Sequence, residues 1–409
     1  MELQLARLTE RIKGHLAKLR CFSSTLEGVT RLPFTAEARQ AIDYLTEAMK
    51  QAGMTVRLDA SGALIGRYEG QTAQTVVLCS HYDSVPHGGA FDGIAGVVCG
   101  LELVRELAAA GRRLPWSLEV VATNDEEGVR FGGGFFSSKA FLGLWQPAQL
   151  TAIHDGEGVS LAAAMRDFGL EPGQISQAAW DLTTIRCFIE IHCEQGPVLE
   201  QQQREIGIVS GIVGMRRYVI SLQGRPDHAG TTPMTMRTDA LALAARLISK
   251  VEDTALTYPE AVATVGFCDI RPNVVNTIAG QVVCNLDIRS RWEADIQAME
   301  DDILGFIRKL ARMRQAGCEV SRTLTVRPAE LDRTLQGLLE NSCRRRGYAF
   351  GYLPSGAGHD ALQLATAVAT AMVFVPSRGG RSHCPEEYSD SRHLAKAVLA
   401  VLDTLENLP

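Results

Sequence analysis

Short, mostly apolar runs that end in polar residues recur along the chain. Residues 75–79 (TVVLC) lead into Ser-His-Tyr-Asp, and residues 116–123 lead into Asn-Asp-Glu-Glu. Residues 187–191 (CFIEI) lead into His-Cys-Glu, and residues 371–375 (AMVFV) precede an Arg-Ser-His sequence. Runs of this length without polar alternation predict strands that are buried on both faces. In open α/β sheets, functional groups gather beyond the carboxyl ends of such strands.

Helical patterns alternate with these strand patterns over residues 1–212. A helix is predicted near 36–53, where apolar residues lie on one side, and it ends before Gly53. A second helix is predicted over about 93–110, ending at Gly111. This alternation predicts βαβ units and an α/β fold class, a mixed, mostly parallel sheet with flanking helices.

The pattern changes between residues 213 and 327. The predicted elements, in the order strand, helix, strand, strand, helix, strand, are 216–223, 239–251, 261–270, 280–289, 293–314 and 318–326. This order is that of a ferredoxin-like α+β domain. Because a strand and a candidate ligand follow it, the domain is predicted to be inserted. We therefore expect one domain made of residues 1–212 and 328–409, and a second made of residues 213–327.

Composition narrows the class of protein. The chain has 409 residues, of which 46% are hydrophobic and 22% charged, as in an ordinary soluble protein. The net charge of -6, with dispersed Lys and Arg, argues against a nucleic-acid partner. No apolar run approaches the roughly 20 residues that span a bilayer, and residues 1–20 lack a signal-peptide core, so we expect a cytoplasmic protein without a membrane partner. The ten cysteines form no CxxC pair and are predicted to be reduced, although Cys193 and Cys384 flank candidate ligands and their thiols could compete for metal.

Five residues of metal-ligand type follow the predicted strands. They are His81, Asp92, Glu127, His192 and His383. Imidazole and carboxylate donors suit zinc, manganese, cobalt or nickel. Two cations about 3.5–4 Å apart need a carboxylate between them, and Asp92, followed by Gly93 in a tight turn, is the predicted bridge. We expect His81 and His192 to complete one site, and Glu127 and His383 the other.

Two further acidic residues are predicted to act beside the cations. Glu126 and Glu127 diverge as the chain leaves its strand, so Glu126 is predicted to face the attacking water as general base and acid. Asp83 lies on the same side of its strand as His81, and its carboxylate is predicted to orient that imidazole. A lone Asp-Glu-Glu run is usually a solvated loop, and a lone His is usually structural. Their joint occurrence favours a hydrolytic site.

Three other segments carry weaker signals. His228 lies in a turn of the second domain and could donate to an oxyanion. Alternatively, this turn has only a structural role. Asn276 and Arg289 lie on either side of a strand hairpin and could clamp a carboxylate. Residues 355–360, which include Gly358 and His359, precede a helix whose backbone N–H groups could hold an anion or a carbonyl. Alternatively, Asp360 is a simple helix cap.

Seven motifs together resemble a known family. They are SHYDSVPHGGAFDG, NDEEGVRF, IEIHCEQGPVLE, DHAGTTPM, RPNVVNTI, SGAGHDA and SHCPEE, between about residues 75 and 390. This set resembles the hydantoinase/carbamoylase branch of the M20 metallopeptidase family, which includes allantoate amidohydrolases, N-carbamoyl-L-amino-acid hydrolases and β-ureidopropionases. The resemblance implies a zinc-peptidase-like catalytic domain with two zinc or manganese ions. It also implies cleavage of a ureido C–N bond, with release of carbon dioxide and ammonia, and a homodimer formed by the inserted lid domains.

The resemblance also assigns roles by position. The five ligand candidates match the family's metal ligands, Glu126 its catalytic base and Asp83 the partner of that base. His228 matches a lid histidine that stabilises the transition state and usually reaches the partner subunit's active site. Gln195, Asn276 and Arg289 match substrate contacts, the last two to the substrate carboxylate. The chain departs from the family in two places, with Cys384 where Asn or Ser is usual and Ala279 where Pro is usual.

The substrate is predicted from fewer residues. Arg217, in the sequence GMRRY, resembles the allantoate-type enzymes, and an extra guanidinium suits the second ureido carbonyl of allantoate. Gly358, in the SGAGHDA motif, favours the same substrate. We expect allantoate to be hydrolysed to ureidoglycine or ureidoglycolate, ammonia and carbon dioxide, with N-carbamoyl-L-amino acids and then N-carbamoyl-β-alanine as alternatives. An M20 dipeptidase or aminopeptidase is disfavoured by the His-x-Glu-Gln-Gly motif at 192–196. A non-catalytic binding protein is disfavoured because the base and all five ligands are present.

Overall fold

The computed structural model describes residues 2–409, which form two compact units. Unit 1 comprises the chain up to Ser210 together with Leu331–Leu353 and His359–Pro409, and unit 2 comprises Gly211–Glu330 and Pro354–Gly358. The segment Pro354–Gly358 differs from the expected division, which places it in the first domain. It belongs to unit 2, where the backbone N–H of Val213 donates to the carbonyl of Ser355 (3.0 Å).

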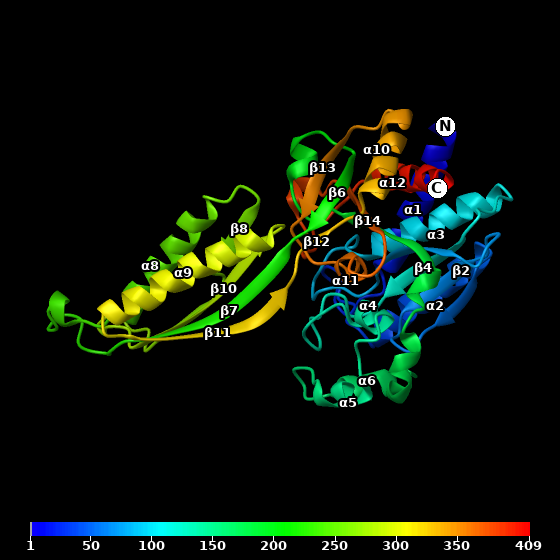
Figure 1. Ribbon diagram of the computed structural model, residues 1–409. Helices are drawn as coiled ribbons and strands as arrows, with labels where there is room; N and C mark the ends of the chain where they lie inside the picture. The colour runs from blue at the N-terminus through cyan, green and yellow to red at the C-terminus, as the bar shows by residue number, and fades with distance from the viewer. Residues whose placement is uncertain (1) are drawn as a thin grey trace. The chain divides into compact units, whose positions relative to one another are not determined.

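The larger sheet has nine strands in the order β1-β2-β4-β3-β5-β14-β6-β12, and β13 also pairs with β6 (Figure 1). The strands are β1 (Thr55–Leu58), β2 (Leu64–Tyr68), β3 (Thr75–His81), β4 (Ser117–Thr123), β5 (Ile185–Cys193), β6 (Ile206–Ile212), β12 (Ala329–Glu330), β13 (Phe350–Ser355) and β14 (Thr370–Val375). The four central strands β4, β3, β5 and β14 are parallel, whereas β1, β2 and β6 pair antiparallel at the sides. Every residue of β3, β4 and β14 is buried. Burial on both faces explains why these strands have no polar alternation.

Helices flank this sheet. Their bounds are α1 (Glu2–Leu19), α2 (Ala36–Gln51), α3 (Ile94–Ala109), α4 (Phe136–Phe141), α5 (Pro147–Ala152), α6 (Leu161–Asp167), α7 (Val198–Gln201), α10 (Arg333–Arg346), α11 (Asp360–Leu364) and α12 (Ser391–Glu406). Helices α1, α3 and α12 pack against one another, with α10 against α12, while α2 packs on β1 and β2. The predicted helices at 36–53 and 93–110 correspond to α2 and α3. Thr35 begins α2 by accepting a hydrogen bond from the N–H of Ala38, as an N-cap should. The predicted α/β fold class is confirmed.

Unit 2 has a five-stranded antiparallel sheet in the order β11-β7-β10-β8, with β9 also paired to β10. Its elements are β7 (Gly214–Gln223), α8 (Ala240–Ala255), β8 (Ala261–Thr264), β9 (Cys268–Arg271), β10 (Gln281–Ser290), α9 (Glu293–Met313) and β11 (Gly317–Val326). This is the predicted β-α-β-β-α-β order, with one difference. The strand predicted over 261–270 is split into β8 and β9, because the side-chain oxygen of Asn285 accepts hydrogen bonds from the N–H groups of Gly266 and Phe267.

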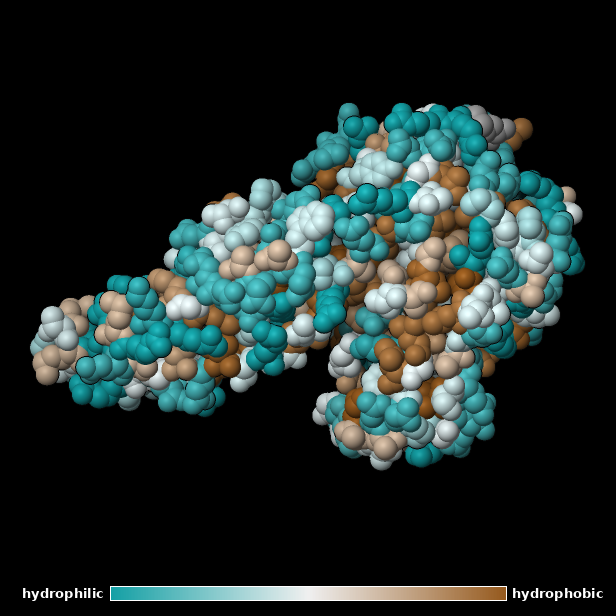
Figure 2. All heavy atoms as spheres, viewed as in Figure 1, coloured by the Kyte–Doolittle hydropathy of each residue, from teal (hydrophilic) through white to brown (hydrophobic). Residues whose placement is uncertain are grey.

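The two helices of unit 2 are amphipathic. Alternate residues of β7 and β10 form a core with the inner faces of α8 and α9, which bury Leu243, Leu247, Ile296 and Ile303. Hydrophilic residues cover most of the outer surface of these helices in the view of Figure 2. Within residues 2–409, no helix combines the length and the apolar character needed to cross a bilayer.

Candidate metal centre and active site

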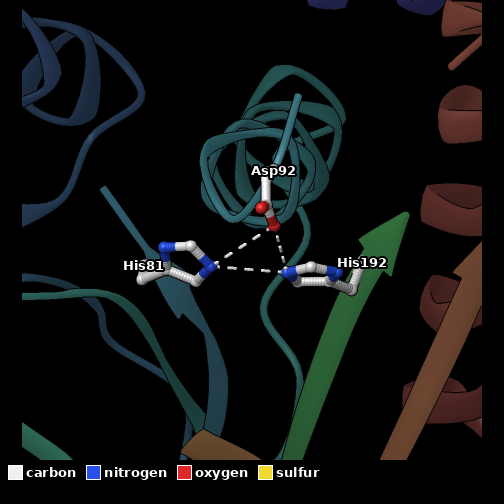
Figure 3. A group of neighbouring side chains, drawn as sticks. All are labelled: His81, Asp92 and His192. Carbon is white, nitrogen blue, oxygen red and sulfur yellow. Dashed lines mark hydrogen bonds and ion pairs between the residues drawn. The ribbon is translucent and has the colours of Figure 1, made fainter. Parts of the chain in front are cut away.

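The carboxyl ends of the parallel strands bring His81, His192 and Asp92 together (Figure 3). His81 is the last residue of β3, His192 lies near the end of β5, and Asp92 lies just before α3. Nε2 of His192 lies 3.2 Å from Oδ1 of Asp92, and Nε2 of His81 lies 3.6 Å from the same oxygen. The two Nε2 atoms are 3.4 Å apart. These three atoms face a common point.

The other oxygen of Asp92 faces a second group. Its Oδ2 lies 3.1 Å from Nε2 of His383, which in turn lies 3.6 Å from Oε1 of Glu127. The structure therefore places the five predicted ligands in two groups that share Asp92, one with His81 and His192 and one with Glu127 and His383. A carboxylate that turns one oxygen to each group has the geometry needed to bridge two cations.

Backbone carbonyls orient the two buried imidazoles. Nδ1 of His81 lies 3.0 Å from the carbonyl oxygen of Asp83, and Nδ1 of His192 lies 2.9 Å from that of Cys193. A carbonyl oxygen only accepts, so each Nδ1 carries the proton, and in the neutral ring Nε2 keeps its lone pair for a metal. The hydrogen bond at His81 comes from the backbone carbonyl of Asp83, while the predicted carboxylate lies farther away, with its Oδ1 3.8 Å from the same Nδ1. The Asp83 carboxylate instead accepts from the N–H groups of Glu126 and Glu127, both at 3.2 Å, and so fixes the turn after β4.

Negative charge exceeds positive charge among these side chains. Burial raises the pKa of Glu127 to about 7, and the charge of Asp92 adds to this rise. Burial also raises the pKa of Glu126 well above its usual range, against the opposing effect of His81. The hydrogen bond to Asp92 raises the pKa of His383 to about 9. The raised pKa values mean that protons bind readily to these side chains and offset their excess negative charge. Divalent cations would offset the same charge.

Three buried oxygens also fit a metal. Oδ1 of Asp92, Oε1 of Glu126 and Oε1 of Glu127 have no hydrogen-bond partner among the described residues. Buried polar atoms are nearly always paired, so three unpaired acceptors at one place fit a group of side chains that could hold cations. The thiol of Cys193, the residue after His192, is not suited to bind a metal. Burial raises the pKa of Cys193 well above its usual range, which keeps the thiol protonated and a poor ligand.

Three of the nine non-glycine residues with positive φ in the described part of the chain lie at this site. Asp125, Gln195 and His383 have positive φ angles of 55°, 60° and 56°. Non-glycine residues in this region cost free energy and cluster at functional sites. Gly93 also has a positive φ of 66°, and a Cβ built on it would overlap the His81 ring. The glycine predicted to permit a tight turn is therefore required at this position for both reasons.

We expect Gly93→Ala to weaken metal binding and to destabilise the fold. Overpacking of this kind costs about 1–3 kcal/mol, and the positive φ adds about 1–2 kcal/mol. Gly111→Ala is the matched control, because Gly111 has a similar φ of 62° and open space around its Cα. Thermal unfolding and bound metal are to be measured for both variants. If Gly93→Ala behaves like Gly111→Ala, the contact with His81 has no importance for the site.

Three residues without a role predicted from the sequence also support the site: Glu387, Ser382 and Ser377. The carboxylate of Glu387 accepts from the N–H groups of Phe91 and Asp92. Ser382 donates its hydroxyl to the same carboxylate, and Ser377 accepts from the backbone N–H of Gln195. The predicted substrate contact Gln195 donates from Nε2 to Oδ2 of Asp92 at 3.1 Å. The SHCPEE motif contains Ser382 and Glu387, so both residues could have been found from this motif in the sequence.

Buried groups on β5 and α11 lie beside the first ligand group. Glu190 accepts hydrogen bonds from the hydroxyl of Ser80 (3.4 Å) and the N–H of Ala361 (3.0 Å). Asp360 accepts from the hydroxyl of Thr123, and His359 is the residue before α11, so the alternative that Asp360 caps the helix is wrong. The ring of His359 lies 4.5 Å from that of His192, and burial lowers its pKa well below the usual range, which keeps it neutral. Because Ala361 donates to Glu190, its N–H does not serve the predicted anion site.

Unit 2 carries the remaining predicted site residues in two places. His228 pairs with Thr277, and the N–H of Ala229 donates to the carbonyl of Asn276, so His228 and Asn276 lie side by side. Nδ1 of His228 accepts from the N–H of Gly230 at 3.0 Å, so its proton is on Nε2. Arg217 and Arg289 lie on adjacent strands and both donate to Asp287, at 2.7 and 2.8 Å. Arg289 also donates to the carbonyl of Gly356 in the SGAGHDA motif.

These two places are far apart within unit 2. His228 and Asn276 lie beyond Gln281 at the start of β10, and Arg289 lies near its end. At about 3.4 Å per residue, the strand from Gln281 to Arg289 spans about 27 Å. The structure therefore does not bring Asn276 and Arg289 together as one carboxylate clamp within a single chain.

Comparison with known proteins identifies the family. The sequence matches the family described as peptidase family M20/M25/M40 over residues 77–407. An N-carbamoyl-L-amino-acid amidohydrolase of Paenarthrobacter aurescens is 39% identical, and an allantoate amidohydrolase of Bacillus subtilis (strain 168) is 32% identical, with 100% of each chain aligned in both cases. The crystal structure of an amidase of the hydantoinase/carbamoylase family from Burkholderia multivorans superposes with a TM-score of 0.90 and 31% identity, covering 97% of both chains. The predicted resemblance is confirmed: the chain belongs to the metal-dependent hydrolases of peptidase family M20/M25/M40, in the hydantoinase/carbamoylase branch.

Proposed function

We propose that this enzyme hydrolyses the ureido C–N bond of a small N-carbamoyl-type acid, with allantoate as the favoured substrate. Allantoate and water would give ureidoglycine, ammonia and carbon dioxide. The observation that carries the proposal is the division of the Asp92 carboxylate between two ligand groups beside a buried glutamate that neither group requires. The relatives, named amidohydrolases of N-carbamoyl-L-amino acids and of allantoate, support a ureido bond over a peptide bond.

Particular side chains of this chain would hold the cations and transfer the proton. His81, His192 and Asp92 would hold one divalent cation, and Asp92, Glu127 and His383 the other, with zinc or manganese favoured and cobalt or nickel also suited to the ligand set. Such cations polarise the ureido carbonyl and lower the pKa of the attacking water. Glu126 would accept the proton of that water on its carboxylate and deliver it to the leaving nitrogen. Asp83 accepts from the backbone N–H groups of Glu126 and Glu127 and so fixes the turn that carries both side chains.

Charged residues of unit 2 would bind the substrate acid. Asp287 accepts from Nε of both Arg217 and Arg289, which fixes two guanidinium groups on the same face of the sheet. We propose that Arg289 binds the substrate carboxylate and that Arg217 binds the second ureido carbonyl of allantoate. Gln195, Gly358 and His359 remain proposed substrate contacts.

A second copy of the chain is part of the proposal. His228 and Asn276 lie beyond Gln281, which is about 27 Å along β10 from Arg289 at 3.4 Å per residue, so one chain cannot apply all three to one small molecule. A homodimer in which unit 2 of one chain supplies His228 and Asn276 to the other chain's site resolves this. The Nε2 proton of His228 would then donate to the developing oxyanion.

N-carbamoyl-L-amino acids are the second candidate substrates. The relative at 39% identity is named for this activity, whereas the allantoate amidohydrolase of Bacillus subtilis is 32% identical. Arg217 is the feature that favours allantoate, because an N-carbamoyl-L-amino acid has no second ureido group for it to bind.

The test is ammonia release by the metal-loaded enzyme across a substrate panel. The panel contains allantoate, several N-carbamoyl-L-amino acids, N-carbamoyl-β-alanine and simple dipeptides. The highest kcat/KM is expected with allantoate. A preference for an N-carbamoyl-L-amino acid would select the second candidate, and turnover of dipeptides alone would contradict a ureido substrate.

Replacing the proposed carboxylate clamp should raise KM. We expect Arg289→Ala to raise KM for allantoate by about 10- to 100-fold, since hydrogen bonds to charged groups contribute about 1.5–3 kcal/mol and 1.4 kcal/mol corresponds to a tenfold change. Arg289→Lys should recover only part of this loss, because an ammonium cannot bind a carboxylate in bidentate geometry. Steady-state kinetics and bound metal are measured on both variants. Unchanged KM in Arg289→Ala would remove this residue from the site.

A further inference from the structure

We propose that Glu387 is a positioning residue that ties the Asp92 turn to the His383 loop and thereby sets the occupancy of one of the two cation sites. The site in question is the one formed by Asp92 Oδ2, Glu127 and His383. This inference rests on the proposed two-cation function and adds a residue that acts on one site selectively. The ligands themselves come from segments nearly 300 positions apart in the sequence, so something must hold these segments in register.

One oxygen of Glu387 fixes the Asp92 turn. The side chain is buried, and its Oε2 accepts from two consecutive backbone N–H groups, those of Phe91 at 2.9 Å and Asp92 at 3.0 Å. Charge-assisted hydrogen bonds of this kind are stronger than neutral ones. The turn closes directly over the carboxylate, because a Cβ built on Gly89 would overlap it. The backbone of the bridging aspartate is therefore held by a residue from the other end of the chain.

The second oxygen of Glu387 fixes the His383 loop. Its Oε1 accepts from the hydroxyl of Ser382 at 2.6 Å, and Ser382 is the residue directly before His383. The same hydroxyl lies 3.3 Å from Nε2 of Gln195, which also donates to Asp92. Glu387, Ser382, Gln195 and Asp92 thus form a connected set of hydrogen bonds around the second ligand group.

The three histidine ligands depend on this carboxylate to different degrees. His81 and His192 are buried, lie on strands β3 and β5, and have Nδ1 bonded to a backbone carbonyl. His383 lies outside the strands and helices, its side chain is 50% exposed, and its φ is positive at 56°. A ligand on a strained, half-exposed loop depends on tertiary contacts for its position. Loss of the Glu387 carboxylate should therefore weaken the His383 site and spare the His81 and His192 site.

The test is the metal stoichiometry of Glu387→Gln. The variant keeps the size of the side chain and one oxygen, but it replaces the other oxygen with an NH₂ group and removes the negative charge, so the side chain can no longer accept from the backbone N–H groups and from Ser382 at the same time. Glu386→Gln is the matched control, since Glu386 is the adjacent, exposed glutamate and its carboxylate pairs with Arg381 (3.0 Å). Ser382→Ala removes one of the three hydrogen bonds and leaves the two at Phe91 and Asp92. Each protein is loaded with Zn²⁺ or Mn²⁺ alone, and bound metal is measured by mass spectrometry and by competition with a chelator.

We expect wild type and Glu386→Gln to bind two equivalents with similar affinities. Glu387→Gln should keep one tight equivalent and bind the second about 10–100-fold more weakly, the usual loss when the partner of a metal ligand is removed. Ser382→Ala should weaken the same equivalent to a smaller extent, and excess metal should restore the turnover lost in either variant. Equal weakening of both equivalents in Glu387→Gln, or two equivalents of wild-type affinity, would overturn the inference. If wild type itself binds fewer than two equivalents, the proposed two-cation function fails instead.

Discussion

Glu126→Gln is expected to lower kcat at least about 10²-fold, the smallest loss usual for removal of a general base, while two cations stay bound. An amide cannot take the proton of the attacking water, but it has nearly the size of the carboxylate it replaces. Oε1 of Glu126 is buried without a hydrogen-bond partner in the described part of the chain, so it is not committed to a structural contact. The variant should also bind substrate with little change in affinity. Steady-state kinetics and metal analysis check both parts.

Glu157→Gln is the control for this variant, because Glu157 is exposed in a turn remote in sequence from the ligands. It should keep wild-type kcat. Near-normal turnover by Glu126→Gln would mean that another group transfers the proton. Loss of one cation from Glu126→Gln would mean instead that Glu126 is a metal ligand. Metal content is therefore worth measuring, because Oε2 of Glu126 lies 3.9 Å from Nε2 of His81.

Much of the fold could be predicted because its strands are buried on both faces. β3, β4 and β14 have no exposed residue, so the sequence shows them as mostly apolar runs, with Glu119 as a buried exception in β4. The positions of His81 and His192 followed from the same signal, since the carboxyl ends of parallel strands meet at one edge. The division of the ligands into two groups could be predicted because Asp92 has two carboxylate oxygens, and each oxygen can face one group.

The features that could not be predicted depend on contacts between distant segments. Asn285 interrupts a strand by bonding to Gly266 and Phe267, and no periodicity in the sequence shows this. The orientation of His81 comes from a backbone carbonyl, which every residue has, so the sequence could only suggest the Asp83 side chain. Strand pairing in unit 2 decides that Asn276 and Arg289 lie at opposite ends of β10. Sequence separation alone made them look like neighbours across a hairpin.

Asp92→Asn should have the largest effect of all, with loss of at least one bound cation and a fall in kcat/KM of at least about 10³-fold. The physical reason is that each carboxylate oxygen serves a different ligand group: Oδ1 faces His81 and His192, and Oδ2 faces His383. An amide keeps one oxygen and presents an N–H₂ group where the other stood, so at least one group loses its shared ligand. A metal ion contributes several kcal/mol to the transition state, and each 1.36 kcal/mol corresponds to a tenfold change in rate.

Asp167→Asn, at the exposed end of α6, is the matched control and should keep two cations and full activity. Metal analysis, chelator competition and kcat/KM are compared across the two variants and wild type. Two cations of unchanged affinity in Asp92→Asn would show that the carboxylate does not join the two groups. Since the assignment of Glu126 as base depends on cations held at this point, that result would also remove the reason for its role.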